Sequence, residues 1–411
     1  MISRLTPSLF FAMAAVFVLA QAAPSRSPAP PPRASPTPAV SPEPARSPSP
    51  IPTPPVVVPA TSWYFAVSGD SRDCGDLIMP KIARSIESLG PTTPVPFYWH
   101  LGDFRKGLDQ HGGQNADRDF VLLRGSSDDY HRHAWDDFVL NQVTPLEKAG
   151  ITVFLGIGNH ELVSPWWGHE EFVAKFGKWL DQEPIRTQRI SDRSRNLLRD
   201  EHHIDYHFVM NGVDFIYLDN SDTYAFTPES LRHPAFTPDQ IGWLAGVLEG
   251  DAGDPAIRAI VVAMHAALPG SSGSAHAMDD TCHGRRSGRT VYDMLQKAQG
   301  LGGPPERRKR VYVLASHSHT YLENIFEKGH PGKVLPGWII GTAGAAQHTD
   351  AIRYGYLLFE AHPDGTLKGT FQEITRDSPP VAATDAQRQL TDFCYTQNLE
   401  PSPHMRVVNC R

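Results

Sequence analysis

From residue 63 onward the chain repeats one pattern, which restricts its fold more than any other feature. A short apolar run rich in β-branched and aromatic residues is followed by a polar or glycine-containing loop and then by an amphipathic stretch. Such runs are typical of buried strands, and strands that alternate with helices predict an α/β architecture. The expected strands are residues 63–67, 96–101, 151–157, 213–218, 259–264 and 311–315.

Helices and further strands are expected between and after these runs. Apolar residues recur at helical spacing over 172–180. Thr237-Pro238 is an N-cap followed by a proline in the first turn, and this helix is expected to stop at Gly250. A third helix is expected over 290–298. Later strands are expected over 338–342, 355–360 and 367–374, with a hairpin turn before the last one.

The first 60 residues are expected to lie outside the folded domain. Arg4, the apolar run 9–20 and the small residues around Gln21 indicate a signal peptide over residues 1–22. This run is shorter than the roughly 20 residues that span a bilayer, although an uncleaved membrane anchor is an alternative. Residues 23–60 hold fifteen of the 37 prolines, which predicts an extended, disordered linker. The linker is either a spacer that associates the domain with an envelope or a plain leader.

Charge and cysteine content indicate partners and compartment. The formal net charge is −7, the first 60 residues are net positive, and no long basic run follows, so nucleic acid is not expected as the principal partner. No later segment is apolar enough to predict a membrane span. In a secreted or periplasmic protein four cysteines pair in one of three ways. We favour the pairs Cys394–Cys410 and Cys74–Cys282, so a disulfide is expected to tie the C-terminal tail, residues 377–411.

Polar side chains with metal-binding chemistry stand at the ends of five of the six expected strands. Carboxyl ends of strands in α/β sheets are where ligands collect. Oxygen and imidazole ligands suit Mn, Fe or Zn, and six such groups are about the number that two ions sharing a ligand need. The six candidate metal ligands are Asp70, Asp103, Asn159, His265, His317 and His319.

The residue types predict a division of roles. A carboxylate such as Asp103 can bridge two cations, and two ions about 3.5–4 Å apart activate a shared water for attack on phosphorus. His160 follows a ligand without being one, so we expect it to stabilise phosphoryl charge or to protonate the leaving oxygen. Glu161 is expected to accept a hydrogen bond that orients His160 or a ligand histidine.

In this order the strand-end residues resemble the calcineurin-like metallophosphoesterase superfamily, and the segment 206–219 is similar to its purple acid phosphatase-like branch. The resemblance spans residues 63–375 and implies a metallophosphoesterase domain over 61–376. It also implies a sandwich of two mixed β-sheets flanked by helices, with a binuclear metal site at one rim. Carried over to this sequence, one ion would be held by Asp70, Asp103 and His319, and the other by Asp103, Asn159, His265 and His317.

Two positions depart from the family pattern. Many members have histidine two residues after the first aspartate, but this chain has Arg72, which stays protonated and cannot bind a cation. Arg72 is expected either to bind substrate phosphate or to form a structural salt bridge with Asp73 or Asp76. Lys106 stands where the purple enzymes have a tyrosine ligand, so no tyrosinate–iron colour is expected, and the first ion would have fewer protein ligands.

The favoured function is an exported hydrolase of phosphomonoesters, with a metal-bridged hydroxide attacking phosphorus. A phosphodiesterase or nucleotide hydrolase on the same site is the alternative within this chemistry. An amidohydrolase would normally carry its His-x-His pair on the first strand, whereas His317 and His319 come late. A non-catalytic surface binding protein on a degraded scaffold is the alternative of another class, and Arg72 and Lys106 favour it.

Overall fold

The structure is a computed structural model that describes residues 61–107, 116–162, 167–195, 197, 204–221, 234–272, 277–300, 308–330, 332–348, 351–401 and 410. The expected signal peptide and proline-rich linker, residues 1–60, lie outside this part. Within the described ranges, no helix is both long and apolar enough to cross a membrane.

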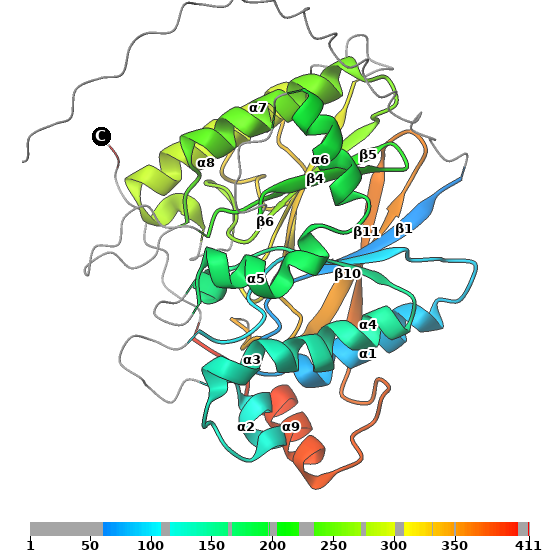
Figure 1. Ribbon diagram of the computed structural model, residues 1–411, viewed down its shortest axis with the longest axis vertical. Helices are drawn as coiled ribbons and strands as arrows, with labels where there is room; N and C mark the ends of the chain where they lie inside the picture. Colours follow the sequence, from blue (N-terminus) through cyan, green and yellow to red (C-terminus); the bar gives the residue numbers. More distant parts are fainter. Residues whose placement is uncertain are drawn as a thin grey trace, which may run out of the picture. The chain divides into compact units, whose positions relative to one another are not determined.

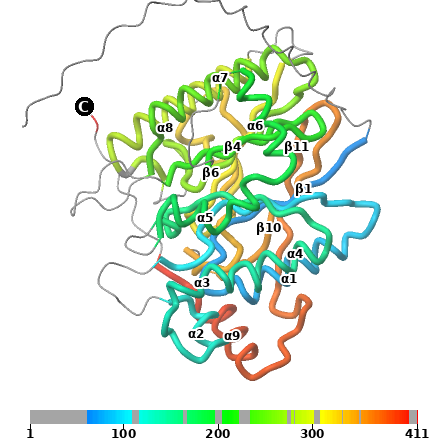
Figure 2. Tube along the Cα trace, viewed as in Figure 1, coloured from blue at the N-terminus to red at the C-terminus, as the bar shows by residue number. Residues whose placement is uncertain are grey.

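The first sheet is mixed and has the strand order β11-β10-β1-β2-β3. Strands β1, β2 and β3 run parallel, whereas β10 is antiparallel to β1 and to β11. Figure 2 shows the consequence for the chain, because β10 near its end lies beside β1 near its beginning. The strands are β1 (Trp63–Ser68), β2 (Phe97–His100), β3 (Thr152–Leu155), β10 (Tyr354–Ala361) and β11 (Leu367–Ile374).

The second sheet is also mixed, with the order β4-β5-β6-β7-β9-β8. Its four central strands run parallel, and each edge strand is antiparallel to its neighbour. The strands are β4 (Tyr206–Met210), β5 (Val213–Leu218), β6 (Ala259–Met264), β7 (Arg310–Ala315), β8 (Tyr321–Glu323) and β9 (Gly337–Ile340).

Aromatic side chains fill the space between the two sheets. Phe65 of β1 and Phe97 of β2 meet Phe215 of β5 edge-on, with ring centroids 5.0 and 5.2 Å apart. Trp99 packs on the same ring at 5.8 Å. Rings of this size supply much of the buried apolar area of a core. The expected fold class, an α/β sandwich of two mixed sheets flanked by helices, is confirmed.

Helices cover the outer faces of the sheets (Figure 1). The helices α7 and α8 pack on the second sheet, where Leu244 and Leu295 join a core cluster with Val262. Helices α1 and α4 contact the first sheet. The α-helices are α1 (Gly75–Ser88), α2 (Arg118–Arg124), α3 (Tyr130–Phe138), α4 (Thr144–Lys148), α5 (His169–Leu180), α6 (Ile185–Ser194), α7 (Pro238–Gly253), α8 (Cys282–Ala298) and α9 (Asp385–Thr396).

One expected helix begins where the sequence predicted, whereas another begins much earlier. Thr237 caps α7, where its side chain and that of Gln240 form a capping box. Helix α8 begins at Cys282, well before the expected residue 290. Its first turns carry Gly284 and Gly288, which lie against other parts of the backbone and side chains too closely for a Cβ. These small residues form no apolar stripe, so the spacing of apolar residues did not predict the first half of α8.

The favoured disulfide pairing is wrong. Cys74 is bonded to Cys394, and Cys282 is bonded to Cys410. The Cα atoms are 6.0 and 5.2 Å apart. Helix α9 contacts α1 and α2, which brings Cys394 beside Cys74 at the N-terminus of α1. The tail is thus tied to two earlier elements of the domain instead of being closed on itself.

Candidate metal centre

The five predicted strand ends meet at one place in the structure. They follow β1, β2, β3, β6 and β7, which contribute the carboxyl ends of parallel strands in both sheets. The backbone turns sharply there, because Asp70, Asp103, His317 and His319 have φ values of +58°, +59°, +64° and +36°. Residues other than glycine rarely have a positive φ, and those that do concentrate at functional sites. The turns bring the candidate ligands within reach of one another.

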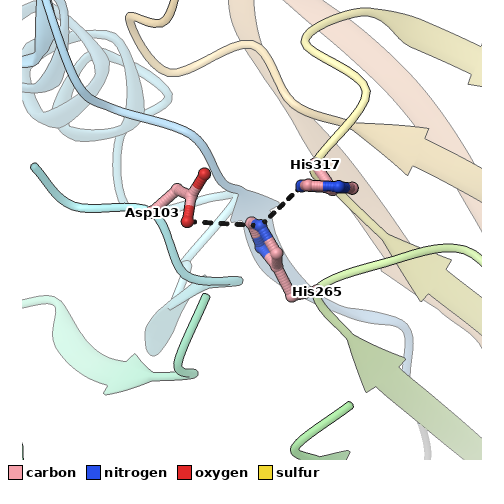
Figure 3. Close-up of side chains that lie close together, drawn as sticks. All are labelled: Asp103, His265 and His317. Atoms are coloured by element: carbon pink, nitrogen blue, oxygen red, sulfur yellow. Dashed lines mark hydrogen bonds and ion pairs between the residues drawn. The ribbon is translucent and has the colours of Figure 1, made fainter. Parts of the chain in front are cut away.

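One group of ligand atoms surrounds Nε2 of His265 (Figure 3). Oδ1 of Asn159 lies 3.0 Å away, Nδ1 of His317 3.1 Å, and Oδ1 of Asp103 3.3 Å. The Nδ1–H of His265 donates to the carbonyl of Leu101 at 2.9 Å, so in the neutral ring Nε2 presents a lone pair. A carboxylate oxygen, an amide oxygen and two imidazole nitrogens therefore converge, which is a suitable donor set for Mn, Fe or Zn.

The electrostatics of this group favour a positive charge. Burial on its own would lower the pKa of His265, but Asp103 and Asp70 raise that pKa to about 9. Burial alone would likewise raise the pKa of Asp103, yet His265, His160 and Arg72 hold it well below its ordinary value. Asp103 is therefore a carboxylate, and its field favours a positive charge at His265.

A second group consists of Asp70, Asp103 and His319, whose ligand atoms lie within 4.8 Å of one another. Oδ1 of Asp70 is 3.4 Å from Nε2 of His319. Burial raises the pKa of Asp70 to about 6, and Asp103 adds to this, whereas His265 and Arg72 oppose it. Asp103 thus belongs to both groups, which is the position that a bridging ligand would need.

Arg72 lies inside the second group. Its Nη2 donates to Nε2 of His319 at 2.5 Å, and its Nε is 3.7 Å from Oδ2 of Asp103. The described ion pairs do not include the expected alternative, which was a structural salt bridge between Arg72 and Asp73 or Asp76. Asp76 pairs with Arg105, and Asp73 lies 3.9 Å from Lys106.

His160 stands beside both groups, partly exposed. The backbone N–H of Gly107 donates to Nδ1 of His160 at 2.8 Å, so in the neutral ring Nε2 carries the proton. Burial and the nearby Arg72 keep the pKa of His160 well below its ordinary value, although Asp103 opposes them. Nε2 contacts Nη1 of Arg72, so donor groups of the two side chains lie next to each other. A phosphoryl oxygen is an acceptor that matches this arrangement.

Glu161 has another role than expected. Its carboxylate accepts the backbone N–H groups of Asp103, Phe104 and Gly158 at 2.9, 2.8 and 2.7 Å. The described hydrogen bonds of Glu161 thus go to backbone, and none joins it to His160 or a ligand histidine. Burial, helped by Asp103, raises the pKa of Glu161 to about 8 against these three donors. Glu161 positions the loops that carry Asp103 and Asn159 and does not touch the ligand atoms.

Two glycines allow these loops to approach each other. Gly102 has φ +94°, and a Cβ built on it would lie 2.5 Å from the backbone nitrogen of Gly158. A Cβ on Gly158 would lie 2.3 Å from Oδ1 of Asp103 and 2.9 Å from Cε1 of His265. Any side chain at these positions would displace the ligand atoms.

Sequence reasoning missed two residues at the edge of the site. His348 stacks on His319, with ring centroids 4.7 Å apart, and its Nε2 is 3.7 Å from a carboxylate oxygen of Glu400. Glu400 reaches this place because the tail pairs with the loop after β9, through a bridge between Gln347 and Leu399. The sequence offered one signal for His348, which is that it is the only ionisable residue of segment 341–348.

Comparison with known proteins adds little to this geometry. No protein-family model matches the chain, and no curated protein matches it. Among similar solved structures, TT1561 of Thermus thermophilus is 10% identical and covers 76% of this chain and 99% of its own, with a TM-score of 0.34. The hypothetical protein PH1004 from Pyrococcus horikoshii is 11% identical, covers 81% of this chain and 97% of its own, and has the same TM-score of 0.34. Neither likeness assigns a family or a function.

Proposed function

We propose that the protein is a metal-dependent phosphoesterase that hydrolyses phosphomonoesters. The observation that carries this proposal is the position of two side chains with N–H groups, Arg72 and His160, which contact each other beside a group of metal-ligand atoms around His265. Metal ligands next to a donor pair for oxygen are what phosphoryl transfer to water requires. The order of the ligands along the chain, which resembles the calcineurin-like metallophosphoesterases and their purple acid phosphatase-like branch, supports the same reaction.

The donor set fits a divalent or trivalent ion, with Asp103, Asn159, His265 and His317 as its ligands. A bound Mn, Fe or Zn ion would supply Lewis-acid activation of water and polarisation of the phosphoryl group. Glu161 contributes by holding the Asp103 and Asn159 loops in register through backbone hydrogen bonds. The second ion implied by the resemblance would need Asp70, Asp103 and His319, where Arg72 now lies.

The chain's own residues have clear tasks in this reaction. Arg72, which remains protonated, binds a non-bridging phosphoryl oxygen and offsets its negative charge. His160 donates a hydrogen bond from its Nε2–H to a phosphoryl oxygen and stabilises the charge there, and the proton that the leaving-group oxygen gains comes from the attacking water. The Gly107 N–H fixes the tautomer that this donation needs. Water supplies the hydroxyl that the phosphoryl group gains.

We further propose that the enzyme acts outside the cytosol, as a secreted or periplasmic protein. The predicted signal peptide and two disulfides support this, because disulfides persist in oxidising compartments. The proline-rich linker would then be a spacer or an envelope attachment.

The test is to remove metal with a chelator, restore Mn²⁺ or Zn²⁺, and assay an aryl phosphate monoester and the corresponding diester. We expect metal-dependent turnover that favours the monoester. Preferential turnover of the diester would replace this proposal with the phosphodiesterase alternative. Bound metal without turnover of either compound would support the alternative of a non-catalytic binding protein. The position of Arg72 among the candidate ligands favours that alternative.

The His160→Ala variant tests the role of the histidine. We expect kcat to fall by about 10²–10³ while the metal stays bound, because His160 is placed outside the group around His265. His133→Ala is a matched control, since His133 is exposed on α3. Loss of metal in His160→Ala would show that the histidine is a ligand and that its assigned role is wrong.

A further inference from the structure

We propose that the guanidinium of Arg72 takes the place of one of the two expected cations, so that the centre binds a single metal ion per chain. That ion would be held by Asp103, Asn159, His265 and His317. This inference rests on the metal-binding part of the proposed function and replaces its binuclear form.

The first argument is the lone pair of His319. Its Nδ1–H donates to the carbonyl of Ala346 at 2.8 Å, so Nε2 has one lone pair to offer. Arg72 Nη2 lies on that lone pair at 2.5 Å. A metal ion would have to lie about 2.0–2.1 Å from the same nitrogen. One lone pair cannot bind both partners, so the guanidinium and an ion exclude each other at His319.

The second argument is charge. Asp70 and Asp103 are both fully buried, and their Oδ1 and Oδ2 atoms respectively have no hydrogen-bond partner within the described residues. Buried carboxylates need a cation or several donors nearby. Arg72 supplies a permanent positive charge on the His319 side of Asp103, whereas the His265 side presents only metal-ligand atoms. One guanidinium and one divalent ion carry three positive charges against the two negative charges of the carboxylates, so charge neutralisation requires no second ion.

The third argument is that the backbone holds Arg72 in place. The N–H of Ser71 donates to the carbonyl of Asp103 at 3.0 Å, and the N–H of Cys74 donates to the carbonyl of Arg72 at 2.9 Å. Cys74 is itself tied to Cys394. The Arg72 side chain is 8% exposed and contacts His160 and His319 at its end. The arginine is therefore built into the site and does not extend from it into solvent.

A chemical consequence separates this centre from a binuclear one. A guanidinium donates hydrogen bonds and carries charge, but it has no empty orbital with which to bind and activate water. Arg72 can therefore hold a phosphoryl oxygen, whereas activation of water depends on the one ion beside His265.

Metal stoichiometry measured by elemental analysis, with the electron paramagnetic resonance spectrum of the Mn²⁺-loaded full chain, tests the inference. We expect one Mn²⁺ per chain with the spectrum of a magnetically isolated ion. Arg72→His should bind two, with the spectrum of a coupled pair, because it exchanges the cation for a ligand beside Asp70 and His319. Arg72→Lys, which keeps a cation, should still bind one.

His319→Ala provides a check that does not depend on changing the arginine. It should keep the single ion, whereas His265→Ala should lose it. Two ions in the wild-type chain, one ion in Arg72→His with its fold retained by circular dichroism, or loss of the ion in His319→Ala would each overturn the inference. These outcomes leave the proposed phosphoesterase activity standing, whereas a wild-type chain that binds no ion would overturn both.

Discussion

At the scale of single residues, Arg105 shows how the loop after β2 is held in place. Its fully buried guanidinium donates to Asp119 at 3.0 Å, to Asp76 at 2.7 Å and to the carbonyl of Ala134 at 3.0 Å, and Asp117 lies 3.5 Å away. Burial, with neighbouring carboxylates adding to it, raises the pKa of Asp117 to about 6 and that of Asp119 well above its ordinary value. This one cation joins α1, α2 and the middle of α3 to the loop that carries Asp103.

We therefore expect Arg105→Met to lower the free energy of unfolding by about 3–5 kcal/mol, because it leaves buried carboxylates without a cation. Arg132→Ala is the control, since Arg132 forms an exposed pair with Asp129 on α3, and we expect a change below about 1 kcal/mol. Urea unfolding monitored by circular dichroism measures both. Equal effects of the two substitutions would contradict the structural role of Arg105.

At the scale of secondary-structure elements, a buried histidine joins the edge of the second sheet to its helices. His207 of β4 lies between Asp192 of α6 and Asp214 of β5, with both ring nitrogens 2.8 Å from a carboxylate oxygen. Asp251 of α7 is near the same cluster, and burial and Asp214 raise its pKa well above the ordinary value. Burial would lower the pKa of His207, but Asp214 and Asp192 raise it from 6.5 to about 10.

The raised pKa of His207 makes the free energy of unfolding fall as the pH rises above 6.5. The folded state holds a proton on His207 that the unfolded chain releases above pH 6.5, so this contribution is fully present below pH 6.5 and is lost as pH rises through about 10. The loss amounts to about 1.4 kcal/mol per pH unit. Asp251 acts in the same direction, because a carboxyl group with a raised pKa is destabilised when it ionises.

Unfolding free energies measured from pH 6 to about pH 11, past the pKa of His207 of about 10, test this coupling. We expect Asp192→Asn to destabilise the protein most at low pH, because it removes a partner of the charged histidine, and the difference from wild type should shrink as pH rises. Asp181→Asn changes the same charge at an exposed site and should show no such trend. A difference for Asp192→Asn that is constant with pH would refute the charged state of His207.

At the scale of the whole molecule, the two disulfides attach the C-terminal segment to the start of α1 and to the start of α8. The Cys74–Cys394 bond joins residues 320 positions apart, and α9 contacts α2 (Figure 2). The same tail places Glu400 beside His348. All proposed metal ligands precede this tail in the chain, so the tail forms a wall of the site without supplying the ion's ligands.

We therefore expect the double variant Cys74→Ser/Cys394→Ser to lose about 2–5 kcal/mol of stability and to be cleaved by protease within α9. Its Mn²⁺ spectrum should stay unchanged, because the ligands remain in place. The matched variant Cys282→Ser/Cys410→Ser breaks the other bond and should leave α9 protected. Loss of the ion in the first variant would show that the tail is needed to hold the metal centre.

The sequence alone determined the strands and the residues at their ends. Strands β5 and β6 have the bounds that the apolar runs predicted, because buried strands are nearly continuous apolar segments and turns follow them. Asp70, Asp103, Asn159, His265, His317 and His319 were found for the same reason, since parallel strands bring their carboxyl ends to one edge.

Only the tertiary structure decided the contacts between segments far apart in the chain. Local patterns do not say which loop faces which, so the cysteine pairs were misassigned and His348 and Glu400 were missed. The direction of the Arg72 side chain was equally undetermined, because Asp73 and Asp76 lie nearer in sequence than His319, which is its partner in space. The strand pattern thus predicted which residues gather at the strand ends, whereas long-range packing decided which side chains lie against them.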